Sequence, residues 1–540
     1  MKADKEAQTA GRGIRQSMSG LHTWAGLLLG WVLYAMFLTG TVSYFKDELS
    51  QWMRPELARL SQVPDQAAVA QRIADELGNL AAGSSQWSIR LPDGRNNSVY
   101  AFWRTRGQGQ RAFGEANFDP ATGQKVSSRE TQGGEFFFRF HFQLHYMPVV
   151  WGRWIAGIAA MFMLVAIISG VITHKKIFVD FFTFRWGKGQ RSWLEAHNAL
   201  SVFGLPFHFM ITYTGLVTLM ALYMPWGENA AFKTPAERQQ MTAELSVFIQ
   251  PGKPSGQKAP LASVEDMVRQ AQERWGKDNV GRVTFVHPGD AAARVAVARG
   301  EAGRVSMSPQ YMEFDGTTGK LLNVRDSVGA AAETRGVLYA LHLGRFSDTQ
   351  TRWLYFLVSF MGTAMVGTGL VMWTVKRRSR LRDPERPHFG FRLVERLNIA
   401  GIAGLSVAMT AFLWANRLLP HPMEARAEWE IHAFFAVWAL ALLHALLRPA
   451  KTAWIEQLSA AAALLFLLPV LNALTTQRPL WLSLAQGDWV FAGIDITCWA
   501  LALLHVVLAV RTARHQPIVQ SKRKPKPLAP LATASSGAAE

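Results

Sequence analysis

The stretch Tyr339-Ala-Leu-His342-Leu-Gly-Arg345 decides how this 540-residue chain is interpreted, because Phe142-Gln-Leu-His145-Tyr repeats its Leu-His pair in an earlier copy. Each pair follows a similar turn. The turn Asp119-Pro-Ala-Thr-Gly precedes His145 by almost the same separation as the turn Asp315-Gly-Thr-Thr-Gly precedes His342. The matching separations indicate that the two stretches occupy the same place in two copies of one unit.

The match continues upstream of these turns. His22 precedes Thr39-Gly40 by the same separation as His197 precedes Thr214-Gly215. A match at several separated points indicates a tandem duplication, and residues at matching positions of a duplication are expected to be equivalent in space.

Long uncharged runs predict a mainly α-helical membrane protein. A helix needs about 20 apolar residues to cross a hydrocarbon core of ~30 Å, and we expect eight such spans. The expected order is a cytoplasmic N-terminal segment (1–20), a first span (21–45), a first external module (46–140), spans two (149–174) and three (197–224), a second external module (225–340), span four (353–375), a C-terminal four-helix membrane block (398–512) and a disordered basic tail (513–540).

The net charge of +18 does not indicate a nucleic-acid partner, because the basic residues gather in alternate connections between the spans. Cytoplasmic loops of membrane proteins carry such an excess of Lys and Arg. We therefore expect both termini to be cytoplasmic, in a multi-pass protein of a bacterial inner membrane. The lipid bilayer is one expected partner. The basic residues nearest the first and fourth spans are Lys2, Lys5, Arg12, Arg15, Lys376, Arg377 and Arg378.

Both external segments have the pattern of a small α+β module. Residues 67–80 and 261–275 place apolar side chains at helical spacing, and alternating strand patterns follow in each segment. Cys498 is the only cysteine. This excludes disulfides within the chain and cysteine-ligated iron–sulfur clusters.

Four histidines form the candidate cofactor site. A pseudo-twofold axis through the duplicated helices would place His22 opposite His197 at one membrane face and His145 opposite His342 at the other. Two facing imidazoles are the ligands of a six-coordinate b-type haem, and helix bundles hold such cofactors between facing helices. We expect two haems at different depths. The alternative for each residue alone is a helix-end histidine at the membrane interface.

Four more histidines lie in the expected spans with less support. His174 and His208 could be haem-edge groups, proton carriers or alternative ligands, although Trp373 and Leu33 stand at the equivalent positions of the other copy. His444 and His505 could bind a third haem, line a quinol site or hydrogen-bond between helices. No partner is expected for the remaining histidines, His141, His287, His388, His421, His432 and His515.

No dinucleotide-binding or phosphate-loop fingerprint is visible in the sequence. An electron source within the chain is therefore not expected. A quinol or another membrane electron donor would have to supply the electrons.

These residues resemble the PepSY-associated transmembrane helix family, which includes ferric-siderophore reductases and iron-uptake factors of bacterial inner membranes. The resemblance covers about residues 15–380 and is carried by His22-Thr-Trp-Ala-Gly-Leu, the two Leu-His pairs, Ser169-Gly170, Thr368-Gly369 and the two Asp-x-x-Thr-Gly hairpins. It implies haem-mediated reduction of a periplasmic ferric chelate. The ligand positions that it implies are His22, His145, His197 and His342.

Two other functions compete with this interpretation. The external modules could bind or inhibit a periplasmic protease, or sense a ligand, with the helices as an anchor that needs no paired histidines. A transporter of the iron chelate would show broken helices and charges near the middle of the bilayer. We expect neither feature in spans one to four.

Overall fold

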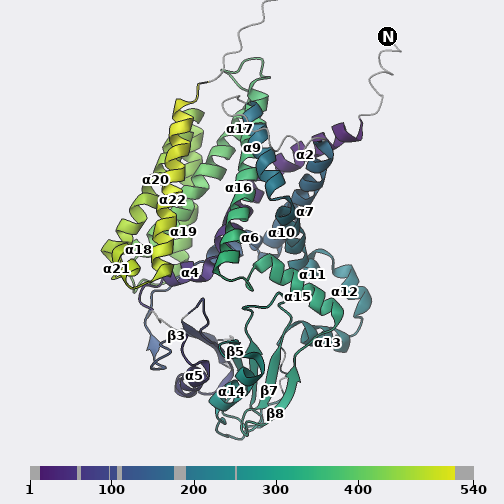
Figure 1. Cartoon of the computed structure of the whole chain (residues 1–540), viewed down its shortest axis with the longest axis vertical. Helices are drawn as coiled ribbons and strands as arrows, with labels where there is room; N and C mark the ends of the chain where they lie inside the picture. Colours follow the sequence, from purple (N-terminus) through teal and green to yellow (C-terminus); the bar gives the residue numbers. More distant parts are fainter. Residues whose placement is uncertain are drawn as a thin grey trace, which may run out of the picture.

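The computed structural model describes residues 13–57, 63–96, 98–105, 112–174, 190–247, 249 and 252–516. Long helices form one end of the molecule, and a separate antiparallel sheet forms the other (Figure 1). The mainly helical architecture is therefore confirmed. The basic loop 175–189 and the part of the expected tail beyond residue 516 lie outside the described residues.

Six helices in the described parts of the chain are long and apolar enough to cross a membrane, and two further helix pairs are each bent at a short break. If each bent pair is one span, the total is eight, the number expected from the sequence. The six are α7 (Val149–Thr173), α16 (Thr349–Arg378), the continuous helix Phe389–Leu418, α19 (Arg426–Leu447), α20 (Ala450–Thr475) and α22 (Trp489–Arg514).

The first and third spans are broken, which the sequence analysis did not expect. Helices α2 (Ile14–Leu28) and α3 (Gly30–Ser43) meet at 66°. The helix Arg191–Phe203 meets α10 (Leu205–Thr218) at 69°. The second break begins at Gly204, and Pro206 follows at the start of α10 without an N–H to donate. The expectation that spans one to four are unbroken is wrong.

The two copies pack in the same way around the bundle. Helix α2 packs on α7, as α9 (Gln190–Phe203) packs on α16. Two shorter helices that precede α7 and α16 repeat this correspondence: α6 (Glu135–Gln143) packs on α3, and α15 (Ala330–Leu343) packs on α10. These equivalent contacts support the duplication.

The two external segments share one eight-stranded sheet with strand order β4-β3-β2-β1-β5-β6-β7-β8. The first copy supplies one half of the sheet and the second copy the other. The halves meet where β1 pairs antiparallel with β5, with Trp87 opposite Phe285. The strands are β1 (Ser84–Arg90), β2 (Val99–Thr105), β3 (Ala112–Phe118), β4 (Lys125–Val126), β5 (Val280–Val286), β6 (Arg294–Arg299), β7 (Tyr311–Asp315) and β8 (Leu321–Arg325).

Helices α5 (Gln66–Leu80) and α14 (Val264–Trp275) pack together against this sheet, and one apolar core contains buried residues of both helices and both halves. The hairpin turns expected from the Asp-x-x-Thr-Gly stretches are present. Asp315 accepts hydrogen bonds from the backbone N–H groups of Thr317 and Thr318, and Gly319 has the positive φ that favours glycine. The two predicted modules are thus halves of a single body.

Short helices connect the bundle and the sheet. Helix α4 (Lys46–Trp52) leaves the first span, while α11 (Met220–Tyr223), α12 (Pro225–Ala231) and α13 (Pro235–Leu245) follow the third. Because α4 and α15 directly follow or precede membrane helices, they bring charged side chains to the boundary between the two parts of the molecule.

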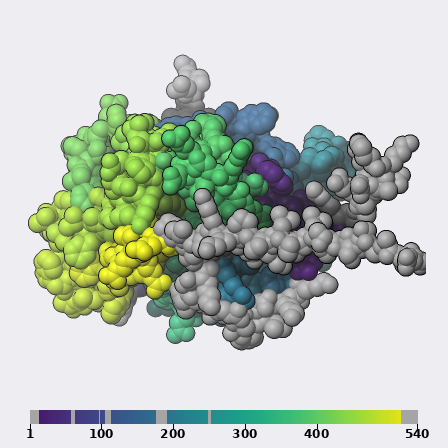
Figure 2. All heavy atoms as spheres, turned by 90° about the horizontal axis from the view of Figure 1, so that it is seen from above, coloured from purple at the N-terminus to yellow at the C-terminus, as the bar shows by residue number. Residues whose placement is uncertain are grey.

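The C-terminal helices form a block beside the duplicated bundle. Figure 2, seen from the end opposite the sheet, shows this block gathered on one side. It contains α17 (Phe389–Ile399), the π-helical turn η1 (Ala400–Gly404), α18 (Leu405–Leu418), α19, α20, α21 (Leu480–Ala485) and α22. Arg426 and Glu430 form a fully buried ion pair in it, and Glu430 also accepts a hydrogen bond from Thr131 of the first copy.

Candidate functional site

Two pairs of facing histidines lie in the duplicated bundle. The pair farther from the sheet, called here the distal pair, joins His22 of α2 and His197 of α9, whose ring centroids are 6.2 Å apart. The duplication predicts that these two residues lie opposite each other, and the structure confirms this placement.

Backbone carbonyls hold both rings of the distal pair. The Nδ1 atom of His22 lies 2.8 Å from the carbonyl oxygen of Ala166 in α7, and Nδ1 of His197 lies 2.8 Å from that of Met365 in α16. A carbonyl oxygen can only accept a hydrogen bond, so each Nδ1 carries the proton. This assigns the tautomer that leaves Nε2 free to bind a metal.

Glycine makes room for each distal ring. A Cβ atom on Gly170 would lie 3.2 Å from Cε1 of His22, and one on Gly369 would lie 3.2 Å from Cε1 of His197. Both glycines follow the carbonyl partner by four residues on the same helix. The small-residue positions noted in the sequence therefore form the seats of the two imidazoles.

The pair nearer the sheet, called here the proximal pair, joins His141 of α6 and His342 of α15, with ring centroids 6.1 Å apart. Nδ1 of His141 lies 2.6 Å from the carbonyl oxygen of Met36, and Nδ1 of His342 lies 3.0 Å from that of Ile211. The same carbonyl seat therefore recurs at a second depth. The seat also includes Gly40 and Gly215, where an added Cβ would lie 2.7 Å and 2.8 Å from the respective rings.

The structure corrects the predicted partner of His342. The Leu-His pair and its spacing from the turn favour His145 and predict no partner for His141. In the structure, His145 instead stacks on Phe435 of the C-terminal block, at 5.5 Å between centroids. Helix α6 ends at Gln143, so His145 lies beyond the helix that presents a ring to His342.

The two pairs lie at different depths in the bundle. Residues Ala156 and Met163 of α7 line the cavity at the proximal pair, whereas Ala166 of the same helix accepts the hydrogen bond of the distal His22. From Ala156 to Ala166 the helix rises about 15 Å. The expectation of two histidine pairs at two depths is therefore correct, although one member of the proximal pair was assigned wrongly.

A cavity surrounds the proximal pair. The space between its walls, together with the open solvent at its mouth, is about 1100 Å³, and both His141 and His342 line it. Most of its wall is apolar and comes from α3, α7 and α10, for example from Leu33, Met163 and Leu216. Such a cavity can hold a large flat ligand with its apolar faces against the helices.

Burial keeps the proximal imidazoles neutral. It lowers the pKa of His342 to about 3, with a further contribution from His141 beside it, and it lowers the pKa of His141 as well. The neutral imidazole is the form that binds metals.

The distance between the rings fits one metal ion between each pair. A transition-metal ion lies about 2 Å from an imidazole nitrogen, so two imidazoles on opposite sides of one ion have centroids about 6 Å apart. Groups of three or more His, Cys, Asp or Glu residues able to hold a metal do not occur among the described residues. Haem iron is held by its macrocycle as well as by protein side chains, so two imidazoles can complete its ligands.

The other four histidine candidates, His174, His208, His444 and His505, do not belong to either facing pair. His208 is fully buried at the start of α10, and neither ring nitrogen has a hydrogen bond of normal geometry to the described residues. His174 follows the last turn of α7. In the C-terminal block, His444 accepts a hydrogen bond from Gln457 and pairs with Glu456, whereas Nδ1 of His505 bonds within its own helix.

Comparison with known families adds one finding. The family model described as the PepSY-associated TM region matches residues 19–376, which include both copies of the duplicated unit and end before the C-terminal block. None of the curated proteins with which the chain was compared matches it.

Proposed function

Because this multi-pass membrane protein belongs to the PepSY-associated TM family, we propose that its two histidine pairs bind two b-type haems and that it carries electrons to a ferric chelate. The observation that supports the proposal is the repeated seat. Four imidazoles occupy equivalent positions, and in each pair the ring centroids are just over 6 Å apart.

Bound haem would supply a one-electron Fe(III)/Fe(II) couple. The protein residues hold that couple in place. His22 and His197 would hold the iron of one haem, and His141 and His342 that of the other. Each Nδ1–H donates to a carbonyl, which fixes the ring and raises the basicity of Nε2. Because two imidazoles would already hold each iron, the substrate would be reduced without binding to it.

The distribution of basic residues supports an orientation with the sheet outside the cytoplasm. Helix α16 ends at the side away from the sheet with Lys376, Arg377 and Arg378. Arg15 lies in α2 on the same side, where it donates to the carbonyl of Thr173. A cytoplasmic location for this side follows from the positive-inside rule. Electrons from a quinol or another membrane donor would then pass from the distal to the proximal pair.

A ferric chelate is the proposed acceptor on the sheet side. Fe(III) is a hard ion that prefers oxygen ligands, and its reduction loosens an oxygen-donor chelate. Arg95, from the connection between β1 and β2, is among the residues that line the proximal cavity, so an acceptor beside the sheet would lie close to the proximal pair. In a bacterium this side would be the periplasm and the substrate would be a ferric siderophore.

Vesicle reduction tests the proposal. The purified protein is placed in lipid vesicles that contain a membrane-impermeant reductant, and a ferric chelate with an Fe(II) indicator is added outside. We expect Fe(II) to form outside only when the protein is present and to disappear in the His22→Ala variant. Equal rates in protein-free vesicles, or in vesicles with that variant, would contradict electron transfer through the bundle.

The two broken spans favour transport of the chelate as a second candidate, because helix breaks at corresponding positions of a repeat mark binding sites in transporters. The breaks are also compatible with electron transfer, because they can orient the helices that carry the distal histidines. Leu29 and Gly204 follow the two distal histidines by the same separation, so the bends set the direction of α2 and α9. Radiolabelled chelate that accumulates inside vesicles would favour the transporter, whereas external Fe(II) without accumulation favours the reductase.

A further inference from the structure

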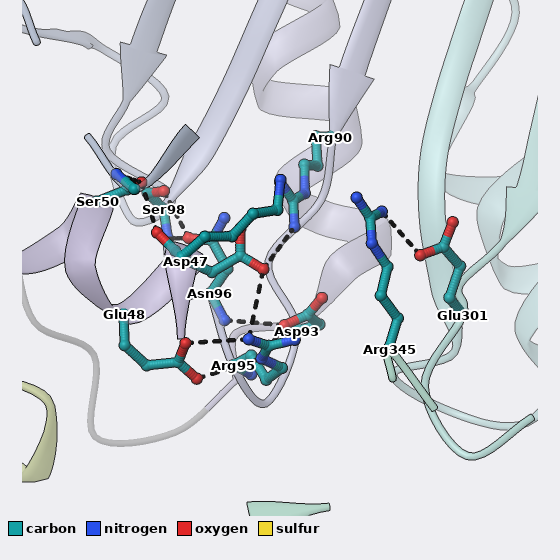
Figure 3. Close-up of polar contacts among 12 residues, drawn as sticks. Asp47, Glu48, Ser50, Arg90, Asp93, Arg95, Asn96, Ser98, Glu301 and Arg345 are labelled. Carbon is teal, nitrogen blue, oxygen red and sulfur yellow. Dashed lines mark hydrogen bonds and ion pairs between the residues drawn. The ribbon is translucent and has the colours of Figure 1, made fainter. Parts of the chain in front are cut away.

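The proximal cavity has one charged wall. Four of its lining residues carry a full charge, namely Lys46, Asp47, Arg95 and Arg345. Three of these residues are cations and one is an anion, and each cation is paired with a carboxylate. Figure 3 shows Asp47 joined to Arg90 and Arg95, and Arg345 to one side of them with its contact to Glu301.

Arg345 closely follows His342 in the sequence, just beyond the end of α15. Helix α15 ends at Leu343, and Gly344 then adopts a left-handed conformation with φ of 61°. A Cβ atom on Gly344 would lie 3.3 Å from the Tyr44 ring, so the turn also depends on the close approach that glycine permits. Arg345 is held beyond the turn by Glu301, at 2.9 Å. The imidazole and the guanidinium are therefore fixed relative to each other.

Acidic partners outside the cavity hold the other two cations. Lys46 pairs with Glu135 at 2.6 Å, and Arg95 pairs with Glu48 at 3.0 Å. Neither of these glutamates is a lining residue of the cavity. The cations are thus ordered before any ligand binds, which reduces the entropy that binding would cost.

The carboxylate already present at this wall shows the effect of these cations. Burial by itself would raise the pKa of Asp47, but the nearby charges of Arg90, Lys46, Arg95 and Arg345 lower it. A carboxylate at this position is therefore kept ionised although it lies away from bulk water. Further carboxylates at the same wall would experience the same field.

We propose that Lys46, Arg95 and Arg345 bind the two carboxylates of the tetrapyrrole held by His141 and His342. This inference rests on the proposed function. Haem b carries two carboxylates on one edge, and charge-assisted hydrogen bonds to arginine or lysine are the means of holding carboxylates away from water. The three cations line one wall of the cavity whose other residues include both imidazoles.

The same cations give the cofactor one orientation. The positions equivalent to Arg345 and Lys46 in the other copy are Leu144 and Ala221. The duplication is therefore symmetrical at the imidazoles and asymmetrical at the wall. A tetrapyrrole with its carboxylates turned the other way would leave them without these charge partners.

Redox titration of the intact protein tests this assignment. Haem content and both midpoint potentials are measured for the wild type, Arg345→Gln and Lys46→Gln at pH values from about 5 to about 8, a range above the ordinary carboxyl pKa. Arg294→Gln is the matched control, because Arg294 pairs with Asp315 on the sheet at 2.9 Å and does not line the cavity.

We expect Arg345→Gln to shift one haem about tenfold toward its oxidised form at about pH 8, or about 59 mV downward for one electron, because the lost cation leaves a carboxylate uncompensated beside the iron. The fall in potential should shrink as the pH is lowered toward about 5, because a carboxylate without its cation takes up a proton when the nearby iron is reduced. Lys46→Gln should act in the same direction, and Arg294→Gln should match the wild type. Selective loss of one haem in both cavity variants would equally support the proposal.

Two results would overturn it. A fall in potential without any pH dependence would show a remote charge effect with no carboxylate contact. Unchanged potentials together with a higher KM for ferric citrate would assign the cations to the carboxylates of the substrate. A wild-type protein that takes up no haem would contradict the proposed function itself.

Discussion

The distal and proximal histidine pairs have the same seats and different surroundings. In both, an imidazole donates to a helix carbonyl beside a glycine. The distal imidazoles come from the bent spans themselves, whereas the proximal ones come from α6 and α15, which follow the sheet segments. The proximal pair also lines a cavity with a charged wall. The duplication thus preserved the carbonyl and glycine contacts of the imidazoles while the two ends of the bundle diverged.

The largest expected effect comes from removing one proximal ligand. His141→Ala should lose one of the two haems, because the proximal pair would keep a single imidazole, whereas His145→Ala should retain both. Haem quantified per chain, with the reduced spectrum, checks this prediction. Retention of both haems in His141→Ala with loss of one in His145→Ala would reverse the assignment of the proximal ligand.

Arg426→Met should weaken the proximal end selectively. Arg426 and Glu430 are 2.5 Å apart with both side chains fully buried, and removing one partner of a buried pair costs about 3–5 kcal/mol. Thr131, which donates to Glu430, lies in the segment just before α6 begins at Glu135. Thermal release of haem, followed spectroscopically, should begin at a lower temperature for the proximal site. Equal weakening of both sites would show that the C-terminal block stabilises the whole bundle.

Glycine-to-alanine substitutions compare the two seats directly. The added Cβ would lie 2.8 Å from the ring of His342 in Gly215→Ala and 3.2 Å from that of His197 in Gly369→Ala. Overpacking costs about 1–3 kcal/mol, and the closer contact should cost more. We therefore expect Gly215→Ala to lose more haem from the proximal site than Gly369→Ala loses from the distal site. Equal occupancy in the two variants would mean that the seats relax to the same degree.

The smallest effect is expected for His208→Leu, which gives α10 the residue found at the equivalent position, Leu33, in the other copy. Because the His208 ring has no hydrogen bond of normal geometry to the described residues, a well-packed leucine should cost less than about 1.5 kcal/mol. Both haems should remain, with slightly changed potentials. Loss of a haem would identify His208 as a ligand and break the symmetry of the pairs.

The sequence was most informative where the duplication left equal spacings. His22 and His197 could be paired because their distances from Thr39 and Thr214 are the same. The proximal pair shows the limit of this reasoning. The separation from Asp119 to His141 is shorter, by more than one helical turn, than the separation from Asp315 to His342. The two copies therefore differ in length between the hairpin and the helix, and a chance Leu-His identity at His145 hid the difference.

Other features depended on contacts that spacing does not report. The fusion of the two sheet segments rests on the pairing of β1 with β5, strands that lie far apart in the chain. The breaks at Leu29 and Gly204 lie in apolar runs whose composition is that of continuous spans. The charged wall combines residues from α4, the β1–β2 connection and the turn after α15. Only the folded chain brings these together.

The most direct measurement is the haem content of the purified wild-type protein, with visible spectra in the oxidised and dithionite-reduced states. Our account predicts two b-type haems per chain with sharp reduced α-bands from histidine ligation on both sides. A colourless protein after expression with ample haem, or one haem that resists substitution of both His141 and His342, would contradict the account.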